Sequence, residues 1–535
     1  MDSSKRSRAR SGGGAGARAA GRAARAASKR DQRARALRSP EAKARQARAR
    51  ERSSASAFAE SEPVVPSHRG IYPGHMTAQM ARKLSPMKTL NAWFSMVAFR
   101  YPARLTMVIF LFLIAVTTGA LLLPASTAPG KSTTFVDAFF TAASSVCVTG
   151  LTVVDTATHW SIFGQVVLAA AITLGGLGVM TMASLLALVV SRRLGVTQRM
   201  LSAEDTRGRI SDAGALVVGV LVTTVTVELV LFLMILPAFL QQGHTFAGAA
   251  WDALFTAISV FNNAGFVNLP EGLSPYIGNW GVVMPLMLAA FVGAIGFPVI
   301  TDLKSNWRTP KRWSLHTKLT LSTYLGLAAL SGVVVAVLEW NNPGTFGPLT
   351  TSEKILNSFV EAINPRSLGV SIVDVGNMTS ASWLVTDISM FIGGGSGSHA
   401  GGIKVATFAV VVIAAWAEAR GLRDVEAFHR RIPHETLRQA VSVLLAAAIL
   451  VLSVAGALLI MTPFSLDRVL FEVISAFGTV GLSTGITPLL PAAAKTLLGF
   501  LMVVGRVGPM TLATALALRQ EKSLIRYPEE RPIVG

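Results

Sequence analysis

The residues best suited to chemistry in this sequence are backbone groups around four glycines. Gly150, Gly265, Gly369 and Gly481 each close a short amphipathic stretch, and a phenylalanine stands ten residues before every one of them. Successive glycines are 115, 104 and 112 residues apart. Glycine reaches backbone angles that other residues avoid, so consecutive carbonyls can face one axis. Carbonyls placed in this way can replace the hydration shell of an alkali cation.

The predicted coordinating residues are the short runs that close on these glycines. They are Val148, Thr149 and Gly150; Asn262, Asn263, Ala264 and Gly265; Ser367, Leu368 and Gly369; and Thr479, Val480 and Gly481. These runs contain no Asp or Glu, whereas rings of acidic side chains are typical of other cation channels. The residues therefore favour a pathway for a monovalent cation and leave potassium and sodium as alternatives. The other interpretation is four ordinary amphipathic connectors that happen to end in glycine.

The surrounding chain is suited to a membrane. Hydrophobic residues make up 51% of the 535 residues, charged residues only 15%, and the mean hydropathy is +0.51. Many apolar runs reach the roughly 20 residues that a spanning helix needs, whereas the glycine stretches are too short to span. Non-helical backbone at membrane depth must be buried in protein or line a water-filled cavity. We therefore predict an all-α polytopic membrane protein of four helix–pore-loop–helix repeats, with eight spans and four re-entrant loops around one central pore.

The predicted organisation is a tail followed by four repeats. The tail covers residues 1–85, and the repeats cover 86–200, 201–313, 314–431 and 432–535. Residues 1–60 hold 17 Lys or Arg against five acidic residues, so we expect disorder there. The tail is suited to remaining solvated or to contacting anionic membrane lipid, and we do not expect nucleic-acid binding. Basic junctions between the repeats place both termini in the cytoplasm by the positive-inside rule, with the four loops entering from outside.

A glycine-rich run interrupts the second helix of the third repeat. Each glycine in a helix costs about 1 kcal/mol relative to alanine, so the cluster predicts a broken helix with a mobile loop. The candidate residues are Gly393, Gly394, Gly395, Ser396 and Gly397, with Lys404 at the far end of the run. Broken helices at membrane depth are where ions are coordinated or gated. The alternative is a packing face of small residues.

Three isolated polar residues complete the set of candidates. Arg506 lies inside the apolar stretch 497–518, where a buried arginine usually faces a cavity or a partner. We expect it to form an electrostatic barrier and to pair with carbonyls of the glycine-rich run. His399 is a candidate switch or a plain polar loop residue. Glu228 is a candidate for pairing with another repeat.

Other classes of protein fit less well. A carrier for organic solutes predicts inverted halves and one substrate pocket, and an intramembrane enzyme needs paired carboxylates, a His-Glu-x-x-His run or a Ser/His arrangement within the spans. We find none of these, and we expect no covalently bound cofactor and no enzymatic activity. The single cysteine, Cys147, excludes an intrachain disulfide. Since no glycine-rich phosphate loop follows a strand, nucleotide control would require another chain.

Several motifs together resemble the Trk/Ktr/HKT superfamily of potassium transporters, and most of all its bacterial Ktr pore-forming subunit. They are SSVCVTGLTVVDT (144–156), FNNAGF (261–266), NPRSLG (364–369), MFIGGGSGSHAGGIK (390–404), VGLSTGITP (480–488), GRVGPMT (505–511) and YPEERPIVG (527–535). The resemblance covers the chain from about residue 90 to its end and implies four repeats around one pore.

The resemblance also implies function and partners. It implies potassium as the transported ion, with sodium open as a coupling or activating ion, and a location in the bacterial plasma membrane. It implies a homodimer with a cytoplasmic ring of nucleotide-binding, RCK-type regulatory subunits, and a gate beneath the filter formed by the glycine-rich run. One departure is in the third loop, where Leu368 precedes the glycine and Val370 follows it. Family members usually have a small residue and an aromatic there, so the resemblance leaves potassium selectivity open.

Overall fold

A computed structural model of the chain describes residues 102–193, 213–241, 245–518 and 530. The chain divides into two units, residues 1–92 and 93–535, and all of the described residues belong to the second. The predicted basic tail and most of the motif at 527–535 therefore lie outside the described residues.

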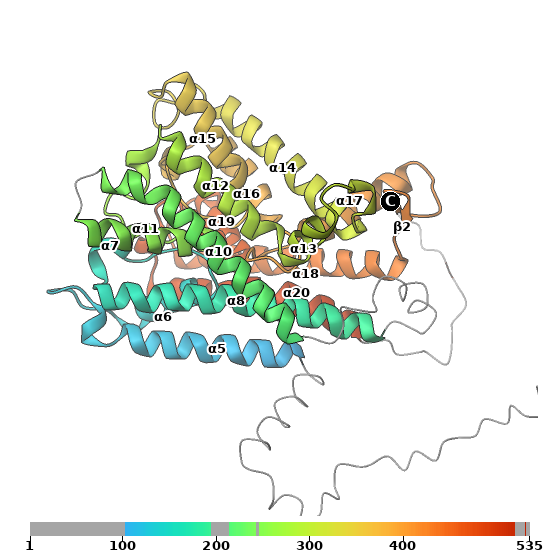
Figure 1. Ribbon diagram of the computed structural model, residues 1–535, viewed down its shortest axis with the longest axis horizontal. Coiled ribbons are helices and arrows are strands. Elements are labelled where there is room, and N and C mark those ends of the chain that lie inside the picture. The colour runs from blue at the N-terminus through green and yellow to red at the C-terminus, as the bar shows by residue number, and fades with distance from the viewer. Residues whose placement is uncertain (1–101, 194–212, 242–244, 519–529, 531–535) are drawn as a thin grey trace, which may run out of the picture. The chain divides into compact units, whose positions relative to one another are not determined.

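The described residues form mainly helices (Figure 1). In the first predicted repeat they are α5 (Pro102–Leu121), α6 (Phe135–Val146), α7 (Thr156–His159) and α8 (Ile162–Arg193). The second contains α10 (Ala213–Leu240), α11 (Phe246–Phe261), α12 (Trp280–Ile295) and α13 (Phe297–Asn306). The third contains α14 (Leu315–Glu339), α15 (Thr351–Ile363), α16 (Ser380–Phe391) and α17 (Val405–Ala419). The fourth contains α18 (His434–Met461), α19 (Leu466–Gly478) and α20 (Ala492–Leu518).

Short elements lie between these helices. They are the 3-10 turns η2 (Pro124–Ser126), η3 (Ser274–Tyr276), η4 (Pro310–Arg312), η5 (Val375–Asn377) and η6 (Thr487–Leu489), and the antiparallel pair β1 (Glu426–Ala427) and β2 (Arg430–Arg431). Figure 1 shows α5, α6 and α8 side by side, and each packs against the other two.

Three of the four short helices that lead to the glycines begin in the same way. The hydroxyls of Thr134, Thr245 and Thr350 accept the backbone N–H three residues later, which satisfies a donor that the helix leaves free. In α15 the cap is reciprocal, because the Glu353 carboxylate also accepts from the Thr350 backbone. α6 has only 12 residues, about 18 Å at 1.5 Å per residue, which is too short to cross a bilayer.

Among the described residues, four helical segments are long and apolar enough to cross a membrane. They are Val217–Leu240, Leu315–Glu339, His434–Met461 and Ala492–Pro509. The bent pair of α12 and α13 makes a fifth if it is counted as one span. Five further apolar helices are shorter, at 10–17 residues, and include Leu105–Leu121 and Ile162–Gly178. The helical, apolar character is confirmed, and the eight-span arrangement stays a prediction.

Two breaks in the helices bear on the predicted site. The break within the third repeat is confirmed, since α16 ends at Phe391 and α17 begins at Val405. The helix–pore-loop–helix pattern also predicts a second helix over residues 280–300 in the second repeat, and this helix is not continuous in the structure. The chain bends by 99° at Gly296, whose φ is +92°. A Cβ on Gly296 would lie 2.8 Å from the carbonyl oxygen of Ser396, so the glycine-rich run packs directly against the bend.

The phenylalanines that mark the repeat do not share one environment. Phe140, Phe255 and Phe471 are buried in the largest hydrophobic cluster, whereas 47% of Phe359 is exposed. The shared phenylalanine therefore anchors α6, α11 and α19 in the core, whereas α15 is held by other contacts.

Candidate functional site

The four glycine loops repeat one backbone conformation. In each loop the glycine and the residue two positions before it have positive φ angles, between +47° and +98°. The pairs are Val148 and Gly150, Asn263 and Gly265, Ser367 and Gly369, and Thr479 and Gly481. Positive φ is uncommon outside glycine, so four equivalent occurrences indicate a conformation that the surroundings impose.

The four glycines form a closed ring. A Cβ built on Gly265 would lie 2.6 Å from the Leu368 carbonyl oxygen and 3.2 Å from the Cα of Gly369. The other three glycines approach the next loop more closely still: Gly150 faces Ala264 and Gly265, Gly369 faces Val480 and Gly481, and Gly481 faces Thr149 and Gly150. Each loop thus meets the next loop along the chain, and the fourth loop meets the first. The structure thus brings all four predicted coordinating runs together, and any side chain on a ring glycine would collide with a neighbouring backbone.

Hydrogen bonds from the ends of the short helices hold the loops. The hydroxyls of Ser144 and Ser475 accept the N–H of Gly150 and of Gly481, each at 3.1 Å. The third loop uses Asn364 instead, whose side chain accepts from the Val370 N–H at 3.0 Å and donates to its carbonyl at 2.8 Å. The backbone of these loops is therefore fastened to α6, α19 and the end of α15.

The unusual leucine of the third loop lies in a hydrophobic cluster. Leu368 is fully buried and belongs to the same cluster as Leu356, Val360 and Val370. Its side chain therefore packs with the core, while its carbonyl oxygen keeps the position next to Gly265.

The glycine-rich run is packed against the neighbouring repeats. The N–H of Gly395 donates to the carbonyl of Ala294 at 2.8 Å, and the carbonyl of Gly397 accepts from the N–H of Phe297 at 3.2 Å. Gly393 bonds to Ile403 at 2.8 Å, which joins the two ends of the run. A Cβ on Gly394 would lie 2.6 Å from that of Ala400. Ser396 is half-buried, and the glycines of the run are buried.

Two cationic side chains approach carbonyls at the far end of this run. Arg506, which is 3% exposed, donates through Nη1 to the carbonyl of His399. Lys404 donates through Nζ to the carbonyl of Ala400. The expected pairing of Arg506 with this run is thus present, although the role of both residues stays a prediction. The His399 ring lies edge-on to Phe261, with 5.2 Å between centroids.

Glu228 has a partner within its own repeat rather than in another. Its Oε1 accepts from the side-chain amide of Asn262 at 2.7 Å, so it contacts the second glycine loop.

Sequence reasoning missed two buried charged residues near the ring. Arg366 is 1% exposed and stands directly before Ser367, and Glu472 in α19 is fully buried. The signal was available, because an ionisable residue in an apolar segment at membrane depth is costly and usually has a specific partner.

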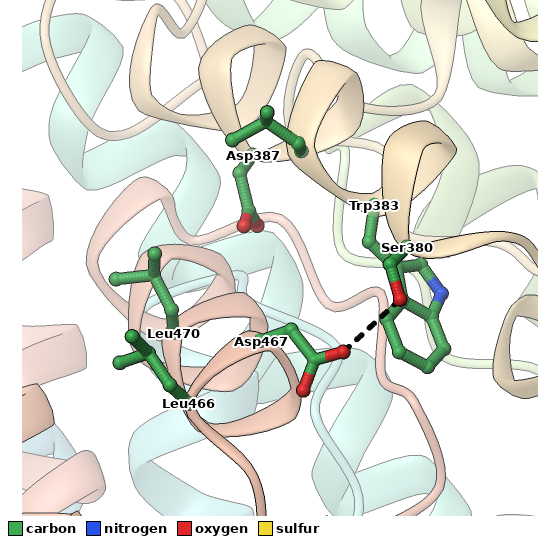
Figure 2. Close-up of a pocket in the computed structure, with 7 residues that line it drawn as sticks. Ser380, Trp383, Asp387, Leu466, Asp467 and Leu470 are labelled. Carbon is green, nitrogen blue, oxygen red and sulfur yellow. Dashed lines mark hydrogen bonds between the residues drawn. The ribbon is translucent and has the colours of Figure 1, made fainter.

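A separate crevice lies between α16 and α19. Figure 2 shows the carboxylates of Asp387 and Asp467 directed into it, and Ser380 donates to Asp467 at 3.2 Å. Its volume is about 440 Å³, and its lining residues are Ser380, Trp383, Leu384, Asp387, Leu466, Asp467 and Leu470. None of the predicted coordinating or gate residues lines it. Over the part of the chain that the structure describes, no group of three or more His, Cys, Asp or Glu is arranged to hold a metal ion.

Comparisons with known proteins identify the family of the chain. Residues 84–525 match the family model TrkH, described as a cation transport protein. The Ktr system potassium uptake protein B of Bacillus subtilis is 37% identical over 79% of this chain and 95% of its own length. The potassium/sodium uptake protein NtpJ of Enterococcus hirae is 33% identical over 86% of this chain and 99% of its own length.

A solved structure shares the fold. The crystal structure of the potassium transporter TrkH from Vibrio parahaemolyticus matches with a TM-score of 0.61 and 17% identity, covering 79% of this chain and 85% of that one. The similarity of sequence spans most of the chain and includes all four glycine loops. The chain therefore belongs to the TrkH family of cation transport proteins.

Proposed function

We propose that this chain is the ion-translocating, channel-like subunit of a Ktr/Trk-type system that takes up potassium across the plasma membrane. The observation that carries the proposal is the closed ring of Gly150, Gly265, Gly369 and Gly481, in which each glycine meets the backbone of the next loop. Carbonyls around such a ring can replace the hydration shell of a monovalent cation, and they carry no charge that would retain a divalent one.

The helices that lead to the ring favour the same ion. α6, α11, α15 and α19 each end just before a ring glycine, so their C-terminal carbonyls are directed toward it. The C-terminal end of a helix carries a partial negative charge and therefore stabilises a cation nearby.

The glycine-rich run acts as the gate in this proposal. Its backbone lies between α12 and α20 and is held there by hydrogen bonds to other helices, among them Gly395 to Ala294 and Gly402 to Gly505. Arg506 and Lys404 donate to carbonyls of the run and place positive charge where an ion would pass. Displacement of Gly393 to Gly397 would open the path.

The wider architecture belongs to the same proposal. The chain would form four repeats with eight spans, with boundaries near residues 200, 313 and 431 and with both termini in the cytoplasm. Relatives named as proteins of the Ktr system support association with other subunits. We expect a homodimer bound to a cytoplasmic ring of nucleotide-binding subunits. Relatives are named as transporters, which supports a function without catalysis.

A second candidate is a less selective transporter of potassium and sodium. Two observations favour it: a relative named as a potassium/sodium uptake protein is 33% identical, and the third loop places Leu368 and Val370 around its glycine. Sodium could also serve as a coupling ion.

The test is uptake of rubidium, potassium and sodium by cells that lack their own uptake systems, with and without a co-expressed regulatory subunit. Gly150→Ser places a side chain against the ring, whereas Gly485→Ser has the same kind of positive φ, +89°, and nothing within 4 Å of its Cβ. We expect selective potassium uptake that only the first substitution abolishes or makes unselective. Equal entry of sodium would favour the second candidate, and no uptake of any ion under either condition would refute both.

A further inference from the structure

Two consecutive residues of the third loop contact the glycine-rich run at its two ends. Arg366 donates through Nη1 to the carbonyl of Ile392 at 3.3 Å, where the run begins. The hydroxyl of Ser367 accepts from the N–H of Gly401 at 3.3 Å, close to where the run ends. One dipeptide next to a ring glycine thus contacts the run on both sides.

The two ends of the run are also joined to each other. Gly393 donates to the carbonyl of Ile403 at 2.8 Å, and Ile403 donates to the carbonyl of Phe391 at 3.3 Å. The run is therefore a loop with a closed neck. Arg366 binds a carbonyl within this neck, and Ser367 binds Gly401, two residues before Ile403. Movement of the neck must either break these two bonds or move the third loop.

The Ser367 hydroxyl extends the connection to the fourth loop. It donates to the carbonyl of Thr479 at 2.6 Å while it accepts from Gly401. A serine hydroxyl has one proton and two acceptor lone pairs, so both bonds can exist together. Ser367 also has a φ of +79°, a conformation that favours glycine. A residue with a hydroxyl side chain therefore occupies a position where the backbone favours a residue without one.

Arg366 is buried without an ion pair among the described residues. Its guanidinium lies 5.3 Å from the centre of the Tyr324 ring, and Nε and Nη2 have no hydrogen-bond partner within the described residues. A buried arginine needs a partner for its charge, and here the contact is with a backbone carbonyl of the run. The nitrogens Nε and Nη2 could donate to further carbonyls if the run moved.

We propose that Arg366 and Ser367 are positioning residues that couple the glycine ring to the glycine-rich run, so that opening the run changes loops three and four. The proposal rests on the proposed function for the meaning of the ring and the run. The coupling itself is a property of the structure and can be measured without transport.

The first experiment is hydrogen exchange on the purified full chain. Ser367→Ala removes the bridging hydroxyl, and we expect peptides around Gly401 to exchange about tenfold faster, since loss of about 1.4 kcal/mol corresponds to a factor of ten. Ser453→Ala is the matched control, because that exposed hydroxyl donates to the carbonyl of Ile449 within α18. Unchanged exchange around Gly401 and in loops three and four would refute the coupling, whatever the protein transports.

The second experiment compares uptake in two backgrounds. We expect Ser367→Ala to raise potassium uptake and to lower the ratio of potassium to sodium in the intact chain, and to leave the uptake rate unchanged once Gly393 to Gly397 are deleted. An equal fold-change in both backgrounds would assign Ser367 to the ring alone and would overturn the coupling. Arg366→Met should resemble Ser367→Ala, while Arg366→Lys, which keeps a charge and a donor, should restore part of the original behaviour. If the intact chain transports no potassium, the proposed function fails, and the exchange experiment still decides the coupling.

Discussion

Replacing Glu472 by glutamine should destabilise the fourth loop while leaving its shape intact. The fully buried carboxylate accepts three hydrogen bonds at Oε1, from the Ser483 hydroxyl at 2.6 Å and from the Thr484 N–H and hydroxyl at 2.9 and 3.2 Å. Its Oε2 accepts from the Thr487 hydroxyl at 2.6 Å. These donors all lie in the segment that follows Gly481.

The magnitude follows from the change of charge. Hydrogen bonds to charged groups contribute about 1.5–3 kcal/mol and neutral ones about 0.5–1.5 kcal/mol, so four bonds lose about 4 kcal/mol in total. Burying an amide costs less than burying a carboxylate, which offsets part of this loss. We expect a net loss of about 1–3 kcal/mol for glutamine and about 3–5 kcal/mol for alanine, which leaves the donors without a partner.

The assay is thermal unfolding of the purified protein in detergent, followed by tryptophan fluorescence. At about 2 °C per kcal/mol, the lower end of the range for large domains, Glu472→Gln should lower Tm by about 2–6 °C. Glu353→Gln is the matched control, because that solvent-accessible carboxylate accepts two bonds from Thr350 and should give a smaller shift. An unchanged Tm for Glu472→Gln would show that the network does not depend on charge and would refute this reasoning.

Three further predictions concern local features of the fold and use the same thermal assay. Thr350→Ala removes the reciprocal cap of α15 and should cost about 0.5–2 kcal/mol, and an unchanged Tm would contradict the role of the cap. Lys495 and Asp137 form an ion pair at 3.1 Å between α20 and α6. Lys495→Met should lower the free energy of unfolding by about 1 kcal/mol. The double variant with Asp137→Asn should lose no more stability than the sum of the two single variants. Phe471→Ala should cost about 3–5 kcal/mol because the ring is fully buried, whereas Phe359→Ala, at the same position of its repeat but 47% exposed, should cost clearly less.

Features that depend on local backbone requirements could be predicted from the sequence. Gly150 and its three counterparts were identified by spacing alone, and the structure holds all four at positive φ. The break between Phe391 and Val405 was predicted because a cluster of glycines cannot sustain a helix. The charge of Arg506 in an apolar stretch predicted a partner, and the His399 carbonyl is that partner.

Features that depend on contacts between separate elements of the fold were missed or wrong. The bend at Gly296 was not predicted, although Gly296 and Pro298 are local signals for one, and the structure places the carbonyl of Ser396 next to Gly296. Arg366 and Glu472 were overlooked as well. Arg366 contacts the carbonyl of Ile392, which is 26 residues away and belongs to a different element.

The occurrence of four glycine loops, the residues that close them and the interruption of one helix could all be read from the sequence. These are local properties, because the permitted φ angles and the helical propensity of a residue depend on its own side chain. Three features became known only from the fold. The four loops close into a ring, and the Leu368 side chain packs with the core. Ser367 bridges two loops and the glycine-rich run. Each of these contacts joins segments that are far apart in the chain. Their residue types are compatible with many partners, so the sequence does not show which partner the fold brings into contact.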